Sequence, residues 1–145
     1  TLVGLGAKRI LFTDDNFTFS LPRVRDICSG IVEGGFHREV QLFAEGRADD
    51  ICRNPIMAGI MSDAGFRGLY VGAESGSEEI LRYYRKDISP GDMLRAVSAC
   101  VEQNLTPAPF LDCWTAVEGV DEVIPALRAG LTAGAQAAPA ALRMT

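Results

Sequence analysis

Acidic residues gather at three places where an apolar run of the sequence ends. The first cluster is DDNFT at residues 14–18, the second is EGRADD at residues 45–50, and the third is ESGS at residues 74–77. Asp112, Trp114 and Glu118 follow a fourth apolar run. Carboxylates beside an arginine and hydroxyl groups can form charge-assisted hydrogen bonds with ammonium and hydroxyl groups. The clusters therefore indicate a binding site for a polar small molecule rather than a hydrolytic site.

Other kinds of site have little material in this sequence. His37 is the only histidine, so the sequence offers little material for a Ser-His-Asp triad or a histidine-based metal site, and no lysine-bearing phosphate loop occurs. Four cysteines, at positions 28, 52, 100 and 113, lie far apart without metal-ligand spacing. Such isolated cysteines are typical of reduced thiols in a cytoplasmic protein. We predict no catalytic residue and no metal ligand in this chain.

The bulk composition excludes two further classes. The net charge of −5 and the lack of a basic run argue against a nucleic-acid partner. No apolar stretch approaches the roughly 18 residues that a membrane span needs. The 145 residues amount to about one domain, and the first residue is Thr rather than Met, which suggests a piece of something longer.

The clusters belong to a repeated pattern of strand and helix. Strand-like runs cover residues 9–13, 40–44, 68–72 and 108–113, and helix-like periodicity follows each of them. Ser20 with Pro22, and Ser89 with Pro90, stand at expected helix starts, whereas Gly65 and Asn104 stand at expected helix ends. The helices expected from this pattern cover roughly residues 21–31, 56–64, 78–84, 90–103 and 120–131.

This alternation predicts an α/β fold with parallel strands. The first three strands start about 30 residues apart, which is the length of one βαβ unit. Both an open doubly wound sheet and a (β/α) barrel fit the pattern, but a closed eight-stranded barrel needs about 250 residues. In either architecture the polar clusters meet at the carboxyl ends of the strands.

Each cluster also has a simpler interpretation. Asp14 and Asp15 could cap the following helix, as could Glu74 and Ser75, and Arg47 could pair with Asp49 at the surface. Side chains for which a packing or solvated role is expected are Cys28, Cys100, Trp114 and His37. The functional interpretation is favoured because three clusters fall at the same end of the sheet.

The residues also resemble a known family. The segments ILFTDDNFT, R-x-x-x-I-C from Arg23, E-x-R-x-D from Glu45, and MSDAGFRGLYVGAESGSEEIL resemble the radical S-adenosylmethionine (SAM) superfamily. The similarity is greatest to the branch whose members often carry a cobalamin-binding domain, and it covers roughly residues 4–103. It implies a partial (β/α) barrel with about four parallel strands and alternating helices. Residues 1–132 would form this core, and the Ala- and Pro-rich residues 133–145 a low-complexity, disordered tail.

The resemblance implies SAM-binding roles for particular residues. Asp14, Asp15 and Asn16 stand where relatives bind the SAM amino group. Glu45 matches a position near the SAM ribose or amino acid moiety, and Arg47 lies close by. The remaining implied contacts are Glu74 and Ser75 with the ribose hydroxyls and Arg85 or Lys86 with the SAM carboxylate.

The chain also departs from the family pattern. Relatives hold a four-iron, four-sulfur cluster on a CxxxCxxC loop after the first barrel strand and use it to cleave SAM reductively and start radical chemistry. No CxxxCxxC occurs here, so we expect the first strand and the cluster loop to lie upstream of Thr1 and this chain alone to be inactive. The DxHxxG sequence of cobalamin-binding domains is absent, so cobalamin dependence is a property of relatives that is possible only in a full-length protein.

Two other hypotheses remain open from the sequence. One is a degenerate or truncated non-catalytic α/β fragment, whose exposed sheet edges predict self-association. The other is a receiver-like signalling module with a Mg²⁺ pocket at Asp14 and Asp15. In the SAM hypothesis the partners are SAM and a substrate that the sequence does not identify.

Overall fold

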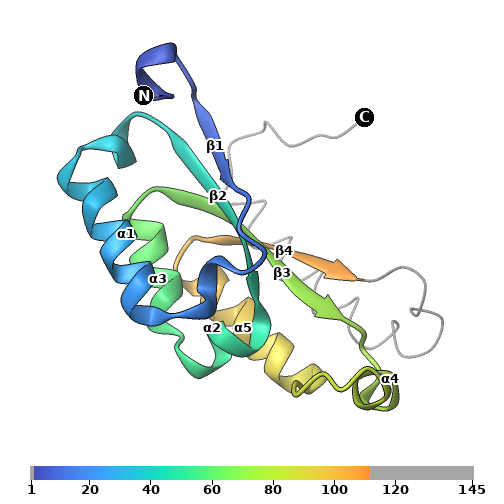
Figure 1. Ribbon diagram of the computed structural model, residues 1–145. Helices are drawn as coiled ribbons and strands as arrows, with labels where there is room; N and C mark the ends of the chain where they lie inside the picture. Colours follow the sequence, from blue (N-terminus) through green and yellow to red (C-terminus); the bar gives the residue numbers. More distant parts are fainter. Residues whose placement is uncertain (1, 112–145) are drawn as a thin grey trace.

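Four parallel strands form a single sheet in the order in which they occur along the chain (Figure 1). The computed structural model describes residues 2–111, with the backbone alone at residues 73, 74, 80 and 108–111. The strands are β1 (Arg9–Phe12), β2 (Gln41–Arg47), β3 (Phe66–Glu74) and β4 (Thr106–Leu111). All three neighbouring pairs are parallel. The predicted α/β fold with about four parallel strands is confirmed.

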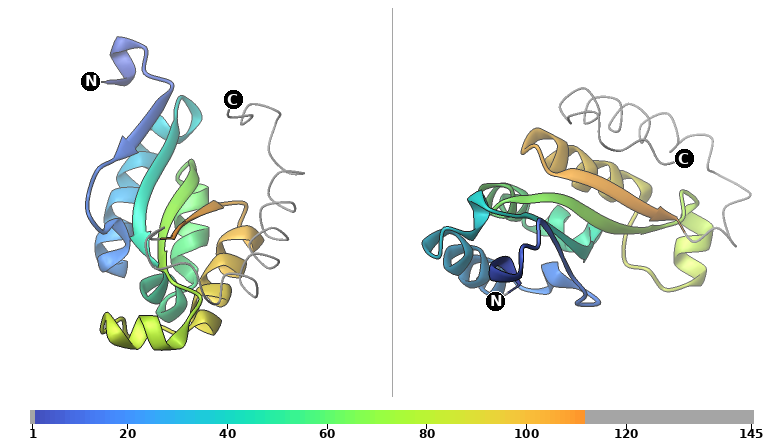
Figure 2. Two further views of the ribbon diagram at one scale, coloured as in Figure 1. Left: turned by 90° about the vertical axis from the view of Figure 1, so that its right-hand side faces the viewer. Right: turned by 90° about the horizontal axis from the view of Figure 1, so that it is seen from above.

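Helices connect successive strands. One long helix lies between β1 and β2, and two helices lie in each of the next connections: α1 (Leu21–Glu33), α2 (Ala48–Arg53), α3 (Ile56–Asp63), α4 (Glu78–Tyr83) and α5 (Pro90–Glu102). Short 3₁₀ helices are η1 (Val3–Leu5), η2 (Phe17–Phe19) and η3 (Phe36–Arg38). Figures 1 and 2 show the strands running side by side, with the C-terminal ends of β3 and β4 on the same side of the molecule.

The long helices cover one face of the sheet. Along β2, Leu42 and Ala44 are buried, whereas Glu45 and Arg47, which point to the opposite face, are exposed. Right-handed crossovers between strands in sequential order place the long connecting helices on the same side. The sheet is therefore an arc of a (β/α) barrel rather than a doubly wound sheet. The receiver-like hypothesis is wrong, because that fold has strand order 2-1-3-4-5.

An aromatic cluster anchors the amino-terminal half of the core. The Phe17 and Phe66 rings are completely buried, with centroids 5.1 Å apart, and the Phe12 ring lies 5.1 Å from Phe17 and 5.5 Å from Phe66. The rings belong to one core cluster with apolar side chains of α1 and α3. Because Phe17 belongs to η2, this packing also fixes the loop that follows β1.

The helix ends follow the predicted signals in most places. Ser89 and Asp92 form a complete capping box at the start of α5, and Asn104 closes that helix in the left-handed conformation at φ +57°. Gly65 ends α3 at φ +90°, a backbone conformation that favours glycine. Ser20 stands at the N-cap of α1 as predicted, but its side chain makes no capping hydrogen bond.

The second polar cluster is not the loop that the sequence suggested. Strand β2 continues through Glu45 to Arg47, which pairs with Gly72, and helix α2 begins at the next residue. Helix α2 has Asp49 and Asp50 in its first turn and Arg53 in its last, an order that complements the helix dipole. The prediction missed this helix because its six residues are too few for an apolar period to show.

Several predictions lie outside the described residues. These are the helix at 120–131, the tail at 133–145, and the roles expected for Asp112, Cys113, Trp114 and Glu118. Within residues 2–111, no helix has the length and apolar character needed to cross a membrane.

Candidate functional site

A cavity of about 640 Å³ lies where the first three strands of the sheet end. Its lining residues come from the loop after β1, from the ends of β2 and β3, and from α2: Asp15, Asn16, Phe19, Glu45, Gly46, Arg47, Asp49, Asp50, Arg53, Tyr70 and Gly72. Parallel α/β folds bind ligands at this end of the sheet, and this volume is within the usual range for small-molecule sites. The predicted convergence of the first two polar clusters is therefore confirmed.

The loop after β1 is fastened to β2 by Asn16 and Thr18. The Asn16 Oδ1 atom accepts hydrogen bonds from the Thr18 backbone N–H at 3.1 Å and from Thr18 Oγ1 at 2.8 Å, so Asn16 caps η2. Thr18 Oγ1 in turn accepts the Arg47 backbone N–H at 3.0 Å. A Cβ atom on Gly46 would lie 2.7 Å from Thr18 Oγ1 and Cγ2, so the loop approaches β2 closely only because residue 46 is glycine.

Two acids and two arginines hold one another beside this loop. Arg47 Nε donates to Asp49 Oδ1 at 2.9 Å, as the simpler interpretation of Arg47 predicted. The Arg53 guanidinium joins both acids, because its Nη1 donates to Asp50 Oδ1 at 3.1 Å and its Nη2 pairs with Asp49 Oδ2. Asn16 Nδ2 donates to the other oxygen of Asp50, Oδ2, at 2.7 Å.

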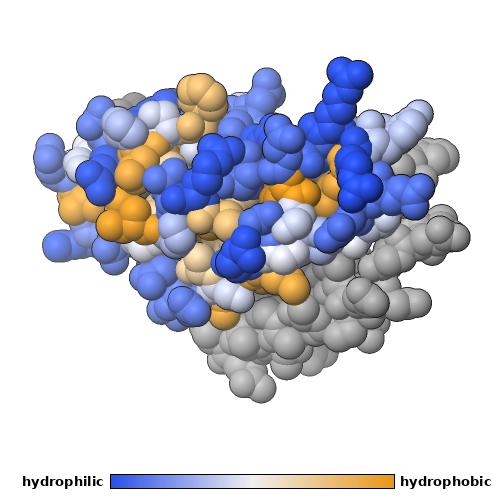
Figure 3. Space-filling model, turned by 90° about the horizontal axis from the view of Figure 1, so that it is seen from below, coloured by the Kyte–Doolittle hydropathy of each residue, from blue (hydrophilic) through white to orange (hydrophobic). Residues whose placement is uncertain are grey.

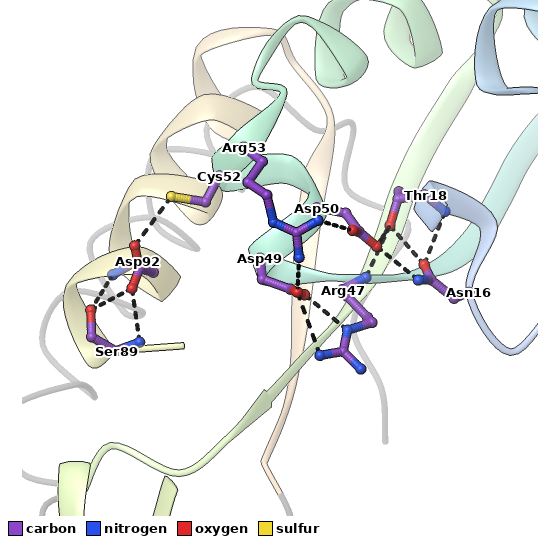
Figure 4. Close-up of polar contacts among 9 residues, drawn as sticks. All are labelled: Asn16, Thr18, Arg47, Asp49, Asp50, Cys52, Arg53, Ser89 and Asp92. Carbon is purple, nitrogen blue, oxygen red and sulfur yellow. Dashed lines mark hydrogen bonds and ion pairs between the residues drawn. The ribbon is translucent and has the colours of Figure 1, made fainter. Parts of the chain in front are cut away.

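These contacts close into a ring, which we call the rim ring (Figure 4). In order, it joins Asn16, Asp50, Arg53, Asp49, Arg47 and Thr18, with the Thr18 hydroxyl closing the ring back to Asn16. Partial burial raises the pKa of Asp49, but the hydrogen bond from Arg47 and the charges of Arg47 and Arg53 outweigh it and hold the pKa below its usual value. Asp49 is therefore ionised at neutral pH.

Asp15 and Glu45 differ from the acids of the rim ring. Both are exposed, both line the cavity, and neither carboxylate makes a hydrogen bond or ion pair within the described part of the chain. An exposed carboxylate without a protein partner keeps its acceptor capacity for a bound ammonium or hydroxyl group. These two residues therefore have the capacity to contact a ligand.

Asp14 points elsewhere. Its carboxylate pairs with Arg23 of α1, whose guanidinium also donates to the Phe17 carbonyl at 3.1 Å and lies 5.3 Å from the centre of the Phe17 ring. The interpretation of Asp14 and Asp15 as helix caps is wrong, because Asn16 supplies the cap of η2. Asp14 instead ties the loop after β1 to α1.

The third polar cluster begins at the end of β3. Glu74 is the last residue of β3, and only its backbone is described. Ser75 is buried, and its hydroxyl accepts the Ser77 N–H at 3.1 Å, as expected of a capping residue. Arg85, exposed at φ +53°, and Lys86, half-buried, follow α4 and are absent from the described lining of the cavity. The SAM-binding roles suggested by the resemblance for Glu74, Ser75, Arg85 and Lys86 stay predictions.

Among residues 2–111, no group of three or more histidine, cysteine or acidic side chains is placed to hold a metal ion. Burial raises the pKa of Cys28 to about 11 and that of Cys100 to about 12, in accord with their expected role in the core. Cys52 of α2 is half-buried, and its thiol donates to Asp92 Oδ1 at 3.4 Å. The described cysteines therefore do not fit an iron–sulfur cluster.

His37 is less solvated than the sequence suggested. It lies in η3, its Nε2 accepts a hydrogen bond from Arg38 Nε at 3.2 Å, and its buried Nδ1 has no hydrogen-bond partner among the described residues. Its backbone also packs about 3.1 Å from the position of a Cβ on Gly65. His37 is thus part of the packing between η3 and the end of α3. This packing lies near the start of β3, whereas the cavity lies where the strands end.

Apolar surface accompanies the charged groups. Figure 3, which views the molecule from below, shows hydrophobic residues exposed among hydrophilic ones. Of the cavity residues, Phe19 is 76% exposed and Tyr70 is 37% exposed. A ligand that fills the cavity would therefore meet carboxylates and aromatic rings together.

Comparison with known proteins gives the arrangement a context. No protein-family model matches the chain. A relative from Pyrococcus horikoshii, named "Uncharacterized methyltransferase PH0819", is 34% identical over 92 residues. The match covers 63% of this chain and 19% of that protein, so the chain spans about a fifth of its relative's length.

Solved structures of radical SAM enzymes share the fold. The radical SAM methyltransferase TsrM from Kitasatospora setae, solved with cobalamin and a [4Fe-4S] cluster, superposes with a TM-score of 0.66 at 19% identity, over 76% of this chain and 23% of its own. The cobalamin-dependent radical SAM enzyme OxsB, solved with aqua-cobalamin and SAM, gives 0.62 at 22% identity, over 83% of this chain and 19% of its own. The fold is that of a segment of radical SAM enzymes. The resemblance seen in the sequence is thus confirmed at the level of fold.

The sequence assigned no role to several residues of the site, although Thr18 and Asp50 lie within its polar clusters. Thr18, Asp50 and Arg53 complete the rim ring, and Phe19 and Tyr70 give the cavity its aromatic surface. The one available signal was the spacing of Asp49 and Asp50 from Arg53, which suits ion pairs at i, i+4 and i, i+3 once a helix is assumed. Nothing in the sequence pattern joins Asp50 to Asn16, which is 34 residues away.

Proposed function

We propose that this chain is the SAM-binding part of a radical SAM enzyme. The observation that carries the proposal is the position of Asp15 and Glu45, which line one cavity with carboxylates that have no partner in the described chain. The family resemblance independently assigned these two residues to SAM. The shared fold with radical SAM enzymes supports the same function.

The chemistry of SAM suits these groups. Its ammonium and ribose hydroxyls are donors for the carboxylates of Asp15 and Glu45, and its flat adenine and methylene groups suit the surfaces of Phe19 and Tyr70. The cavity of about 640 Å³ is within the range of cofactor sites. When reductively cleaved, bound SAM supplies the radical that starts the chemistry in this family, whereas this chain's residues bind and orient it.

The other cofactors of the family require residues that this chain does not supply. The cysteines of the described chain do not fit a cluster, and no CxxxCxxC occurs in the 145 residues. The proposal therefore places the cluster ligands, and any cobalamin site, on protein outside this sequence. We further propose that residues 1–132 form the partial core and that this chain alone does not cleave SAM.

Equilibrium binding of SAM to the complete 145-residue chain tests the proposal. We expect saturable binding by calorimetry and a loss of about tenfold in affinity for Glu45→Gln and for Asp15→Asn, because each removes one charge-assisted hydrogen bond. Asp63→Asn, at an exposed position on α3 away from the cavity, is the matched control and should leave affinity unchanged. Absence of binding, or equal affinities in all variants, would contradict the proposal.

A further inference from the structure

We propose that Asp50 is a positioning residue that fixes the two sides of the cavity relative to each other. The inference rests on the proposed function for its consequence in SAM binding, but its structural part concerns the protein alone. One oxygen of Asp50 binds Asn16, in the loop after β1, and the other binds Arg53, in α2. Through these contacts a single carboxylate orients residues that approach the cavity from different elements.

Asp50 itself is poorly placed to bind a ligand. Its side chain is 8% exposed, and both of its oxygens already accept hydrogen bonds, at 2.7 Å and 3.1 Å. A buried carboxylate is tolerated only when such partners satisfy it. Its influence on a ligand therefore passes through its neighbours.

The first branch fixes the loop after β1. Asn16 uses Nδ2 on Asp50 and Oδ1 on the N–H and hydroxyl of Thr18, so both ends of its side-chain amide are engaged. Asp15 directly precedes Asn16 and lines the cavity. Fixing Asn16 thus limits the positions that the Asp15 carboxylate can adopt.

The second branch fixes the opposite side. Arg53 bridges Asp50 and Asp49, and Asp49 binds Arg47 Nε. Two carboxylates and two guanidiniums balance in charge. If Asp50 became neutral, Arg53 would interact more strongly with Asp49. The ion pair between Asp49 and Arg47 would then be weakened. The branch therefore makes the position of Arg47 depend on the charge of Asp50.

An exchange of the two residues gives a sharp test. In Asp50→Asn, the new amide has one acceptor oxygen for two donors, Asn16 Nδ2 and Arg53 Nη1, so one hydrogen bond is lost. In the double variant Asn16→Asp with Asp50→Asn, residue 50 donates to the new carboxylate and accepts from Arg53, while residue 16 still accepts from Thr18. The exchange restores the ring and keeps the net charge.

Two readouts separate this inference from the proposed function. Amide hydrogen exchange at Thr18 and Arg47, measured without any ligand, should become at least about tenfold faster in Asp50→Asn and return to the wild-type rate in the exchange variant. The SAM dissociation constant should rise about tenfold in Asp50→Asn and recover in the exchange variant. Asp63→Asn should change neither readout.

Each outcome decides a separate question. If the wild-type chain binds no SAM, the proposed function fails, and the exchange rates still decide whether Asp50 positions the loop. If the amide hydrogen-exchange rates do not change in Asp50→Asn, or do not return to the wild-type values in the double variant, the positioning role is overturned. Should Asp50→Asn unfold the chain, Arg53→Gln replaces it, because the Arg53 side chain is 64% exposed and its removal opens the ring without emptying a buried site. Unchanged exchange at Thr18 and Arg47 in that variant also overturns the inference.

Discussion

At the scale of single residues, the polar side chains of the cavity divide into two groups. The members of the rim ring bind one another, whereas Asp15 and Glu45 present carboxylates that the described chain does not use. The division follows from burial, since a carboxylate enclosed by the protein requires protein donors and an exposed one does not. The ring therefore builds the site, and the exposed acids remain for a ligand.

A substitution at Gly46 tests how closely the loop after β1 must approach β2. We expect Gly46→Ala to destabilise the chain by about 1–3 kcal/mol, because the added Cβ would lie 2.7 Å from the Thr18 side chain and push the loop off β2. Gly30→Ala is the control, since nothing lies within 4 Å of its added Cβ in α1 and alanine favours a helix by about 1 kcal/mol. Urea unfolding of both variants gives the comparison, and equal stabilities would contradict the close contact.

The buried thiols give a second prediction. Because only the thiolate reacts, pKa values of about 11 for Cys28 and about 12 for Cys100 should leave both unmodified by iodoacetamide at pH 8 in the folded chain. Cys52, which is half-buried, should react faster than either. Peptide mapping by mass spectrometry with and without urea measures this. Rapid native labelling of Cys28 or Cys100 would show that the core is open.

At the scale of elements, short helices set the geometry of the site. Helix α2 follows β2 without a connecting loop, so its first turn places Asp49 and Asp50 beside the loop after β1. Its Cys52 contacts Asp92 at the start of α5, which links the site to the capping box of α5 (Figure 4). The orientation of α2 thus depends on packing at both of its sides.

The capping box of α5 predicts a dependence of stability on pH. The hydrogen bonds from the Ser89 hydroxyl and backbone N–H lower the pKa of Asp92 from 3.8 to about 2. A pKa depressed in the folded state adds stability above the unfolded pKa, and this stability is lost as pH falls from about 4 toward about 2. Ser89→Ala should cost about 1 kcal/mol at pH 7 and reduce this acid-induced loss.

Ser98→Ala, at an exposed position in the middle of α5, is the matched control. It removes a hydroxyl from the same helix without touching the cap and should change stability by no more than a few tenths of a kcal/mol. Chemical unfolding at a series of pH values between 2 and 7 gives the dependence of the unfolding free energy on pH for both variants. If Ser89→Ala kept the wild-type pH dependence, the capping box would not be the cause.

At the scale of the whole molecule, the sheet is an arc with helices on one face. Leu11 on β1 and Phe43 on β2 are register partners, and Leu11 is 47% exposed on the face that the long helices do not cover. In a closed barrel this face points inward and is packed by side chains of other strands. The arc therefore presents apolar surface that the described helices leave uncovered.

This surface and the edge of β1, which pairs with no second strand among residues 2–111, predict association between copies of the chain. We expect Leu11→Glu to shift the population toward monomer, with little change in unfolding free energy because the side chain is already half exposed. Val32→Glu, at a residue of α1 with 42% exposure, should leave the distribution unchanged. Sedimentation velocity over a range of concentrations measures the effect. A wild-type chain that remains monomeric throughout would contradict the prediction.

The fold class and most helix boundaries were determined by the sequence alone. Apolar periodicity, the Ser89 and Asp92 capping signals, Gly65 and Asn104 are local features, and local backbone and capping energetics suffice to read them. The convergence of Asp15 and Glu45 also followed from sequence, because the ends of parallel strands meet. Periodicity along the chain did not give the strand order; the family resemblance implied the barrel arc, and the structure confirmed it over the doubly wound sheet.

Only the tertiary structure decided which polar residues are engaged. Asn16 and Asp50 are 34 residues apart, and their hydrogen bond requires both the crossover through α1 and the close approach of the loop at Gly46. Arg85 and Lys86 were grouped with the site by resemblance, yet the path of the chain through α4 leaves them outside the described lining of the cavity. Long-range contacts of this kind depend on packing in three dimensions, which residue types and spacing along the chain do not specify.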